Sequence, residues 1–161
     1  MDWGFEIMTR IMFVCHGNIC RSPLAEFIFK DMLSRRGCAG EFIVSSSATS
    51  TEEIYRDIGN PVYPPAREIL ASHGISCEGK RAVQLRAEDA DRYDLFIGMD
   101  GANIRNMQRI LGNSASAKIH KLLDFTEQGG DVADPWYSDR FDIAYDDICR
   151  GCEALLNYLL N

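Results

Sequence analysis

The chain has 161 residues, with 46% hydrophobic and 25% charged residues and a net charge of −7. This length and composition predict one compact domain over residues 1–161, with enough apolar side chains for a sizeable core. The acidic balance argues against nucleic acid or an anionic membrane surface as the partner. No apolar stretch approaches the roughly 18–20 residues that span a bilayer, so no membrane insertion is expected. An anionic substrate therefore needs a local positive site.

The N-terminus and the cysteines bear on the cellular compartment. Residues 1–8 predict a loose extension without the basic start and apolar run of a secretory signal. A chain of this size does not need disulfides to fold, so we expect reduced thiols and a cytoplasmic location. Cys149 and Cys152 lack a second pair of ligands, so no zinc site is expected. The other cysteines are Cys15, Cys20, Cys38 and Cys77.

The first half of the chain alternates between strand and helix patterns. Residues 10–14 form an apolar run typical of a buried parallel strand, which stops at the first cysteine. A helical pattern begins at Ser22-Pro23, because proline is well tolerated in the first turn of a helix, and it ends at Gly37. A second strand is expected at residues 42–44.

The remainder continues this alternation. A polar stretch rich in glycine and proline, residues 45–65, predicts a long functional loop. Asp100 is expected to cap a helix. The alternation predicts an α/β fold of three αβα layers, with a four-stranded parallel sheet, helices on both faces and a ligand site at the carboxyl ends of the strands. Helices are expected at 65–73, 100–111 and 139–160, strands at 94–99 and 117–121, and a loop at 124–138.

The loop after the first strand has the composition of an anion site. Its sequence is Cys15-His16-Gly17-Asn18-Ile19-Cys20-Arg21-Ser22. A turn from strand to helix can point successive backbone N–H groups at an anion, and the helix dipole adds positive charge there. The planar fork of Arg21 can hold two phosphate oxygens. These eight residues, called the phosphate loop below, therefore predict a local positive site at which an acidic chain can bind a dianion.

The same positive field favours the thiolate form of Cys15, which is a ready nucleophile. The Ser22 hydroxyl can donate a hydrogen bond to that sulfur and help it leave later. Asn18 tolerates the left-handed backbone that tight anion-binding loops often require. The alternative is a buried thiol at a strand end beside a solvated helix arginine, Arg21.

A second group is needed to protonate the leaving oxygen. Asp134-Pro135-Trp136-Tyr137 follows the fourth expected strand, where an acid can reach the strand ends. Asp134 is predicted to protonate the leaving group and then to activate water. The alternatives are that Asp134 only caps a turn, as aspartate before proline often does, and that Trp136 and Tyr137 are core aromatics rather than exposed walls of a slot.

Several short motifs together resemble one enzyme family. They are residues 14–23 and 134–137, with further matches at 44–50, 58–61 and 73–75, and Met99-Asp100 followed by Asn103. From Arg10 onward the chain is similar to the low-molecular-weight protein tyrosine phosphatases. The combination of the phosphate loop with the distant acid is highly specific to that family.

The resemblance implies a fold and a catalytic mechanism. The implied fold is a four-stranded parallel sheet flanked by helices. Cys15 is implied to be the nucleophile that forms a phosphocysteine, Arg21 to bind the phosphate and Asp134 to be the general acid and base. Asn18 is implied to hold the strained loop, with Ser46 as its hydrogen-bond partner.

The resemblance also implies the substrate contacts. The substrate is a phosphotyrosine-containing protein or a small aryl phosphate, with no metal or organic cofactor, and the protein is expected to be a monomer or weak dimer. Cys20 is implied to form a reversible disulfide with Cys15 under peroxide, although it could equally be a packed core thiol. The implied substrate-binding residues are His16, Gly17, Asn18, Ile19, Cys20, Ser22, Tyr55, Trp136 and Tyr137.

Three positions depart from the family pattern. Lys80 is nearest to the position of a histidine that often supports the loop asparagine. Val83 stands where an arginine often precedes a Gln-Leu pair. Residues 51–57 extend the variable loop, in which Tyr55 is expected to supply the usual aromatic ring.

Three other functions are compatible with parts of this pattern. Arsenate reduction on the same fold needs a relay of further cysteines, and only Cys77 lies in the relevant segment. Enzymes that hydrolyse arginine phosphate tend to carry a small polar residue where Ile19 stands. A non-catalytic phosphopeptide binder is expected to have lost Cys15 or Asp134, and both are present.

Overall fold

The computed structural model describes residues 7–161, so residues 1–6 of the expected N-terminal extension lie outside the described residues. The strands are β1 (Thr9–Cys15), β2 (Phe42–Ala48), β3 (Ile54–Tyr55), β4 (Ile58–Gly59), β5 (Leu95–Gly98) and β6 (Ile119–Lys121). The α-helices are α1 (Arg21–Arg35), α2 (Pro64–Ser72), α3 (Gly101–Leu111), α4 (Pro135–Ser138) and α5 (Phe141–Leu160). Short 3-10 turns are Ala39–Glu41, Ala87–Asp91, Asn113–Lys118 and Leu122–Phe125.

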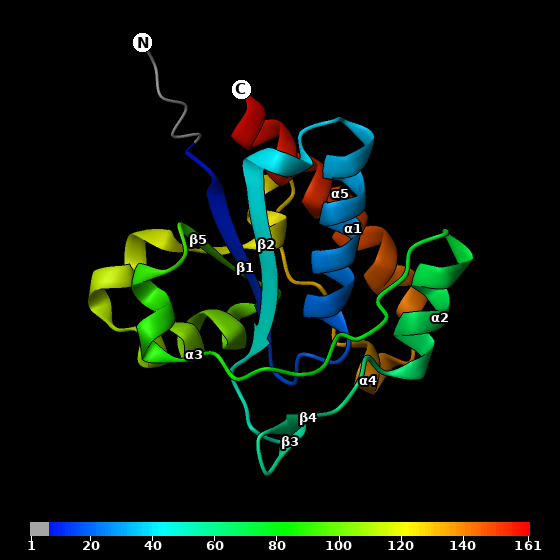
Figure 1. Cartoon of the computed structure of the whole chain (residues 1–161), viewed down its shortest axis with the longest axis horizontal. Coiled ribbons are helices and arrows are strands. Elements are labelled where there is room, and N and C mark those ends of the chain that lie inside the picture. Colours follow the sequence, from blue (N-terminus) through cyan, green and yellow to red (C-terminus); the bar gives the residue numbers. More distant parts are fainter. Residues whose placement is uncertain (1–6) are drawn as a thin grey trace.

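A four-stranded parallel sheet with the order β2-β1-β5-β6 forms the centre of the fold. β1 pairs with β2 over its whole length, from Thr9 opposite Phe42 to Cys15 opposite Ala48. All four carboxyl ends therefore lie at one edge, where the hairpin of β3 and β4 and the short helix α4 are also found (Figure 1). The predicted parallel sheet is confirmed.

Helices cover both faces of the sheet. Successive side chains of a strand point to opposite faces. Ile11 and Phe13 accordingly belong to a core cluster with α1, α2 and α5, whereas Met12 and Val14 belong to a second cluster with α3. Figure 1 shows α3 on one side of the sheet and α1, α2 and α5 on the other. The predicted three layers are confirmed.

The predicted loop at residues 45–65 contains more regular structure than expected. β2 extends through Ala48 instead of ending near residue 44, because β1 offers hydrogen-bond partners along its full length. The rest of the predicted loop contains the β3–β4 hairpin, with Arg56 and Asp57 at φ of 50° and 64° in its two-residue turn. Such turns need positive φ to match strand twist.

The ends of the last helices also differ. Asp139 has a φ of 58° and ends α4, so α5 begins at Phe141 rather than at residue 139. Asp100 caps α3 as predicted, because its carboxylate accepts the Asn103 N–H at 2.8 Å. None of the helices in residues 7–161 is both long and apolar enough to cross a membrane.

Candidate active site

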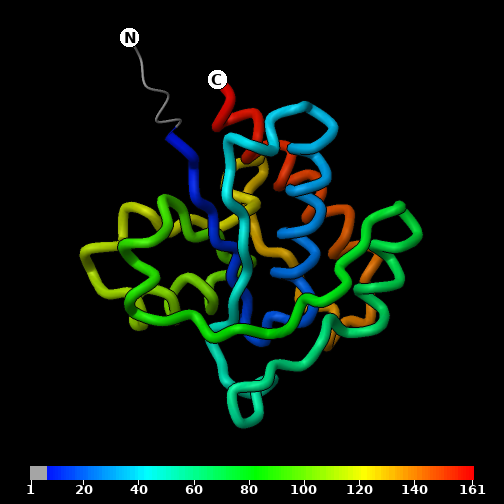
Figure 2. The backbone as a smooth tube through the Cα atoms, in the orientation of Figure 1, coloured from blue at the N-terminus to red at the C-terminus, as the bar shows by residue number. Residues whose placement is uncertain are grey.

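The phosphate loop lies at the carboxyl edge of the sheet, between β1 and the first turn of α1. Cys15 is the last residue of β1, and Arg21 is the first residue of α1. The tube in Figure 2 shows the loop, in blue, near the hairpin that descends from β2. The strand end, the helix N-terminus and the hairpin thus surround one pocket.

The sulfur of Cys15 is surrounded by hydrogen-bond donors. The backbone N–H groups of Asn18 and Ser22 point at Sγ from 3.3 Å and 3.4 Å. The Ser22 hydroxyl lies 3.0 Å from the same sulfur. Because the Asn18 amide donates to Ser22 Oγ at 2.8 Å, the hydroxyl hydrogen is free to point at the sulfur. The structure thus brings two backbone donors and one hydroxyl together at the Cys15 sulfur.

Asn18 holds the loop in a strained conformation. Its φ is 59°, in the left-handed region, and its side chain is buried. The amide nitrogen donates to Ser22 and, at 2.9 Å, to Ser46 Oγ, while the amide oxygen accepts the Val83 N–H at 3.0 Å. Every polar atom of this side chain has a partner. Val83 contributes through its backbone, so the loss of an arginine side chain there does not remove this contact.

A buried ion pair supports Ser46 from behind. The Ser46 hydroxyl donates to Glu26 Oε1 at 2.6 Å, and Lys80 Nζ donates to the Ser46 carbonyl at 2.9 Å. Lys80 Nζ lies 3.6 Å from Glu26 Oε1, and Lys30 contacts the other oxygen of Glu26 at 2.6 Å. Burial lowers the pKa of Lys80, which the negative charge of Glu26 opposes. Lys80 thus reaches the loop through Ser46 rather than by contacting Asn18.

Arg21 is buried and fixed on two sides. Its Nη1 donates to Asp100 Oδ2 at 2.7 Å and to the Val132 carbonyl at 2.9 Å, and its Nη2 lies 3.5 Å from Asp134 Oδ2. Burial alone would lower the pKa of Arg21, but the negative charges of Cys15, Asp100 and Asp134 raise it. The guanidinium therefore remains a cation aimed into the pocket.

Asp100 is a site residue that sequence reasoning treated only as a helix cap. Burial by itself would raise the pKa of this carboxyl, but hydrogen bonds from Arg21 and from the Asn103 and Ala102 N–H groups hold it below its ordinary value. The sequence contained a signal that places Asp100 near the site, because Asp100 comes just after the buried strand β5. That strand lies beside β1, so their carboxyl ends meet.

Asp134 caps a turn, the alternative raised from the sequence, and it also faces the buried arginine of the loop. One carboxylate oxygen accepts the Trp136 N–H at 3.0 Å and caps α4, while the other faces Arg21. The hydrogen bond from Trp136 thus fixes the Asp134 carboxylate and uses only one of its two oxygens. Trp136 and Tyr137 are 54% and 87% exposed, so they are not core aromatics. The Trp136 ring packs on Tyr63 with centroids 5.0 Å apart, a support that the sequence did not indicate.

Most of the predicted residues line one pocket. Asn18, Ser22, Ser46 and Tyr55 do not line it. The expectation that Tyr55 supplies a wall is wrong: its ring is 72% exposed in the hairpin, where the guanidinium of Arg56 lies over it. Glu52 and Glu53 do line the pocket, and sequence reasoning did not single them out. The pocket residues are Cys15, His16, Gly17, Ile19, Cys20, Arg21, Glu52, Glu53, Asp134, Trp136 and Tyr137.

Cys20 lines the pocket as a buried thiol in negative surroundings. Its side chain is buried, and burial together with the negative charges of Cys15 and Asp134 raises the pKa of the Cys20 thiol to about 12. The cysteines are free thiols. Within residues 7–161, no group of three or more His, Cys, Asp or Glu side chains is arranged to hold a metal ion.

Comparison with known proteins identifies the family to which this chain belongs. Residues 10–161 match the family model for low molecular weight phosphotyrosine protein phosphatase. The chain is 38% identical to the low molecular weight protein-tyrosine-phosphatase YfkJ of Bacillus subtilis over 92% of this chain and 94% of that protein. It is 32% identical to PtpA of Staphylococcus haemolyticus, a protein of the same class, over 95% of each chain.

Solved structures give the same result. The crystal structure of YfkJ from Bacillus subtilis matches with a TM-score of 0.89 and 37% identity, covering 95% of each chain. That of SP-PTP, a low molecular weight protein tyrosine phosphatase from Streptococcus pyogenes, matches with a TM-score of 0.83 and 34% identity, covering 96% of this chain and 95% of the other. The chain belongs to the low molecular weight protein tyrosine phosphatase family and is an enzyme of that class.

Proposed function

We propose that this enzyme hydrolyses phosphotyrosine, in proteins or as small aryl phosphates, through a phosphocysteine on Cys15. The observation that carries the proposal is that the Cys15 sulfur, the Arg21 guanidinium and the Asp134 carboxyl line one pocket. The Cys15 sulfur accepts from two backbone N–H groups, and the Arg21 guanidinium lies 3.5 Å from the Asp134 carboxylate. A nucleophile, an anion clamp and a proton donor are the parts that phosphate-ester cleavage needs.

The first step transfers the phosphoryl group to sulfur. The Cys15 thiolate attacks phosphorus, the bond from phosphorus to the tyrosine oxygen breaks, and protonated Asp134 gives its proton to that oxygen. Tyrosine leaves and phosphocysteine remains. Arg21 and the loop N–H groups bind the equatorial oxygens, where negative charge is spread in the transition state.

The second step returns the enzyme to its starting state. The Asp134 carboxylate takes a proton from water as the water oxygen attacks phosphorus, and the bond from phosphorus to sulfur breaks. Inorganic phosphate leaves with the added oxygen. The Ser22 hydroxyl, 3.0 Å from Cys15 Sγ, stabilises the departing thiolate.

The walls of the pocket favour an aromatic ester. Ile19, Trp136 and Tyr137 line it, and the exposed Trp136 ring is backed by Tyr63. A flat apolar wall beside the anion loop suits a phenyl ring above the phosphate, because aromatic pairs gain from stacking and burial. The proposed preference is therefore for phosphotyrosine over phosphoserine and phosphoarginine.

Several finer properties belong to the same proposal. We propose that the chain acts as one catalytic domain in the cytoplasm, as a monomer or weak dimer, and that a reversible Cys15–Cys20 disulfide protects the nucleophile. A thiol nucleophile at Cys15 supports a reducing compartment, because it must stay unoxidised to act. The position of Cys20 in the same pocket as Cys15 supports the redox role.

Hydrolysis of p-nitrophenyl phosphate in the presence of a chelator tests the mechanism. The proposal expects full activity without added metal, none in Cys15→Ser, and a loss of about a hundredfold or more in Asp134→Ala. Turnover by Cys15→Ser, or dependence on a divalent metal, would contradict it. Phosphotyrosine, phosphoserine and phosphoarginine peptides, with an arsenate-reduction assay alongside, separate the substrate classes.

A further inference from the structure

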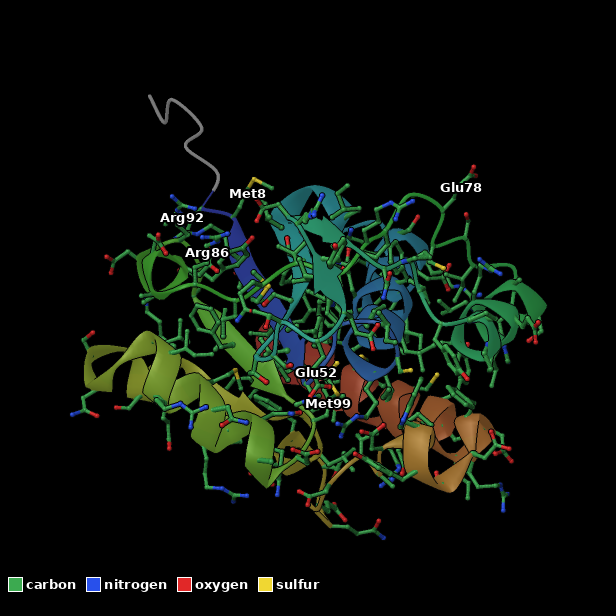
Figure 3. The ribbon with its side chains drawn as sticks, turned by 90° about the horizontal axis from the view of Figure 1, so that it is seen from below. Met8, Glu52, Glu78, Arg86, Arg92 and Met99 are labelled. Carbon is green, nitrogen blue, oxygen red and sulfur yellow. The ribbon has the colours of Figure 1, made fainter. Side chains whose placement is uncertain are left out.

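Two neighbouring carboxylates stand at the mouth of the pocket. Glu52 and Glu53 precede β3 and line the same pocket as Cys15 and Arg21. Figure 3 looks onto this end of the molecule and shows Glu52 near the middle of the face, far from Glu78 at its edge. The segment just before the hairpin and the loop that carries Asp134 therefore line one and the same pocket.

Both carboxylates are held in place. Glu52 Oε2 lies 3.0 Å from His16 Nε2, a direct link between the hairpin segment and the phosphate loop. The stem of Glu53 packs against Gly17, where an added Cβ would lie 3.2 Å from Glu53 Cγ. Its Oε2 accepts from Asn60 Nδ2 at 2.7 Å, and its carbonyl accepts the Asn60 N–H at 2.8 Å.

The basic partner at this mouth is a histidine, His16, which contacts Glu52 and is charged only when protonated. Within residues 7–161, neither Glu52 nor Glu53 forms an ion pair with a lysine or an arginine. Arg21 lies at the bottom of the pocket and is committed to Asp100 and Asp134. Arg56, the basic residue of the hairpin, lies over the Tyr55 ring at 5.3 Å. The site is thus positive at its base and negative at its rim.

We propose that Glu52 and Glu53 are specificity-determining residues that select phosphotyrosines flanked by lysine or arginine. This inference rests on the proposed phosphotyrosine activity. The phosphate is bound at the base of the pocket, and the residues beside it in the substrate meet the rim. Acidic neighbours are repelled there, whereas basic neighbours form exposed ion pairs, each expected to change kcat/KM by about two- to fivefold.

Two matched phosphotyrosine peptides test this selection, one with lysine on both sides of the phosphotyrosine and one with glutamate. The wild-type enzyme is expected to favour the lysine peptide by about tenfold in kcat/KM at low salt, and salt should reduce that ratio because exposed charges are screened. Glu52→Gln, Glu53→Gln and the double variant keep oxygen acceptors for His16 and Asn60 but remove charge. The ratio should fall stepwise and reach about two in the double variant.

Glu78→Gln is the matched control, since Glu78 is an exposed acid that lies away from this pocket. Its peptide ratio should equal that of the wild type. A wild-type ratio near one, a ratio insensitive to salt, or an unchanged ratio in the double variant would overturn the proposal. Failure of the wild type to hydrolyse any phosphotyrosine substrate would instead contradict the proposed function, so the two failures are distinguishable.

Discussion

The Arg21 guanidinium donates a hydrogen bond of 2.7 Å to Asp100, although 79 positions separate the two residues in the chain. Asp100 also caps α3, so the phosphate clamp is attached to a rigid helix of the opposite layer. The same nitrogen donates to the Val132 carbonyl. In the proposed mechanism these contacts fix the direction of the Arg21 guanidinium before substrate arrives, which would reduce the cost of organising the transition state.

Replacing Asp100 with asparagine should misdirect the clamp. The amide can still accept the Asn103 N–H as a cap, but its NH2 group can face Arg21 and repel it. We expect kcat/KM for p-nitrophenyl phosphate to fall by about 10- to 100-fold, equivalent to roughly 1.4–3 kcal/mol. Asp94→Asn is the control, because Asp94 pairs with Arg10 at the other end of β1. Equal activities of the two variants would show that Asp100 does not position Arg21.

Asp100 should also contribute to stability in a defined pH range. Its pKa in the folded protein lies below the unfolded value of 3.8. As pH falls, the unfolded chain therefore binds the Asp100 proton before the folded chain does. The stabilisation by the Asp100 carboxylate is fully present above pH 3.8 and is lost as the pH drops through the lower pKa of the folded protein. Urea unfolding between about pH 5 and pH 2 should show a shallower acid loss in Asp100→Asn than in the wild type. If the free energy of unfolding falls with pH at the same slope in both proteins, Asp100 makes no such contribution to stability.

Removing the lysine behind the phosphate loop should affect catalysis as well as stability. Lys80→Met removes the hydrogen bond from Lys80 to the Ser46 carbonyl and leaves Lys30 as the ion-pair partner of Glu26. We expect a loss of about 1–3 kcal/mol in stability and, as Asn18 loosens, slower alkylation of Cys15 and a severalfold lower kcat. Lys80→Arg should restore much of both, because it keeps the charge and the donors.

Lys118→Met is the matched control for that experiment. Lys118 is also partly buried and donates to two backbone carbonyls, those of Ala90 and Tyr93, away from the pocket. It should lose stability with no change in kcat or in the alkylation rate. If Lys80→Met behaves in the same way, the Glu26–Lys80 pair is structural only and does not position the loop.

Gly59 should not tolerate a side chain. A Cβ there would lie 1.9 Å from the Ala82 carbonyl oxygen and 2.7 Å from its nitrogen. Gly59→Ala must therefore separate the hairpin from the segment that carries the Val83 N–H to Asn18, at a cost of about 2 kcal/mol or more. Gly40→Ala is the control, because nothing lies within 4 Å of its added Cβ. Urea midpoints that match in the two variants would contradict the close approach.

The role of Cys20 can be separated from its packing. Peroxide should inactivate the wild type reversibly, with activity recovered by a thiol reductant, whereas Cys20→Ser should lose activity permanently as Cys15 oxidises further. Cys38→Ser, at a buried thiol outside the pocket, is the control and should behave as the wild type does. Full recovery of Cys20→Ser would show that no protective disulfide with Cys15 forms.

Local patterns in the sequence predicted most of the secondary structure. The apolar run before Cys15, the proline after Ser22 and the cap at Asp100 are short-range features, and the structure places a strand, a helix and a cap there. The β3–β4 hairpin escaped prediction because each of its strands has only two residues. A pattern of period two cannot be recognised over so short a length.

The sequence by itself determined the chemistry of the phosphate loop, because the residues from Cys15 to Ser22 are contiguous and the turn from strand to helix is local. Only the tertiary structure decided what surrounds that loop. Since β5 lies beside β1, Asp100 reaches Arg21, and since β2 lies on the other side, Ser46 reaches Asn18. These contacts join segments far apart in the chain, so their partners follow from the strand order of the sheet and not from any local pattern.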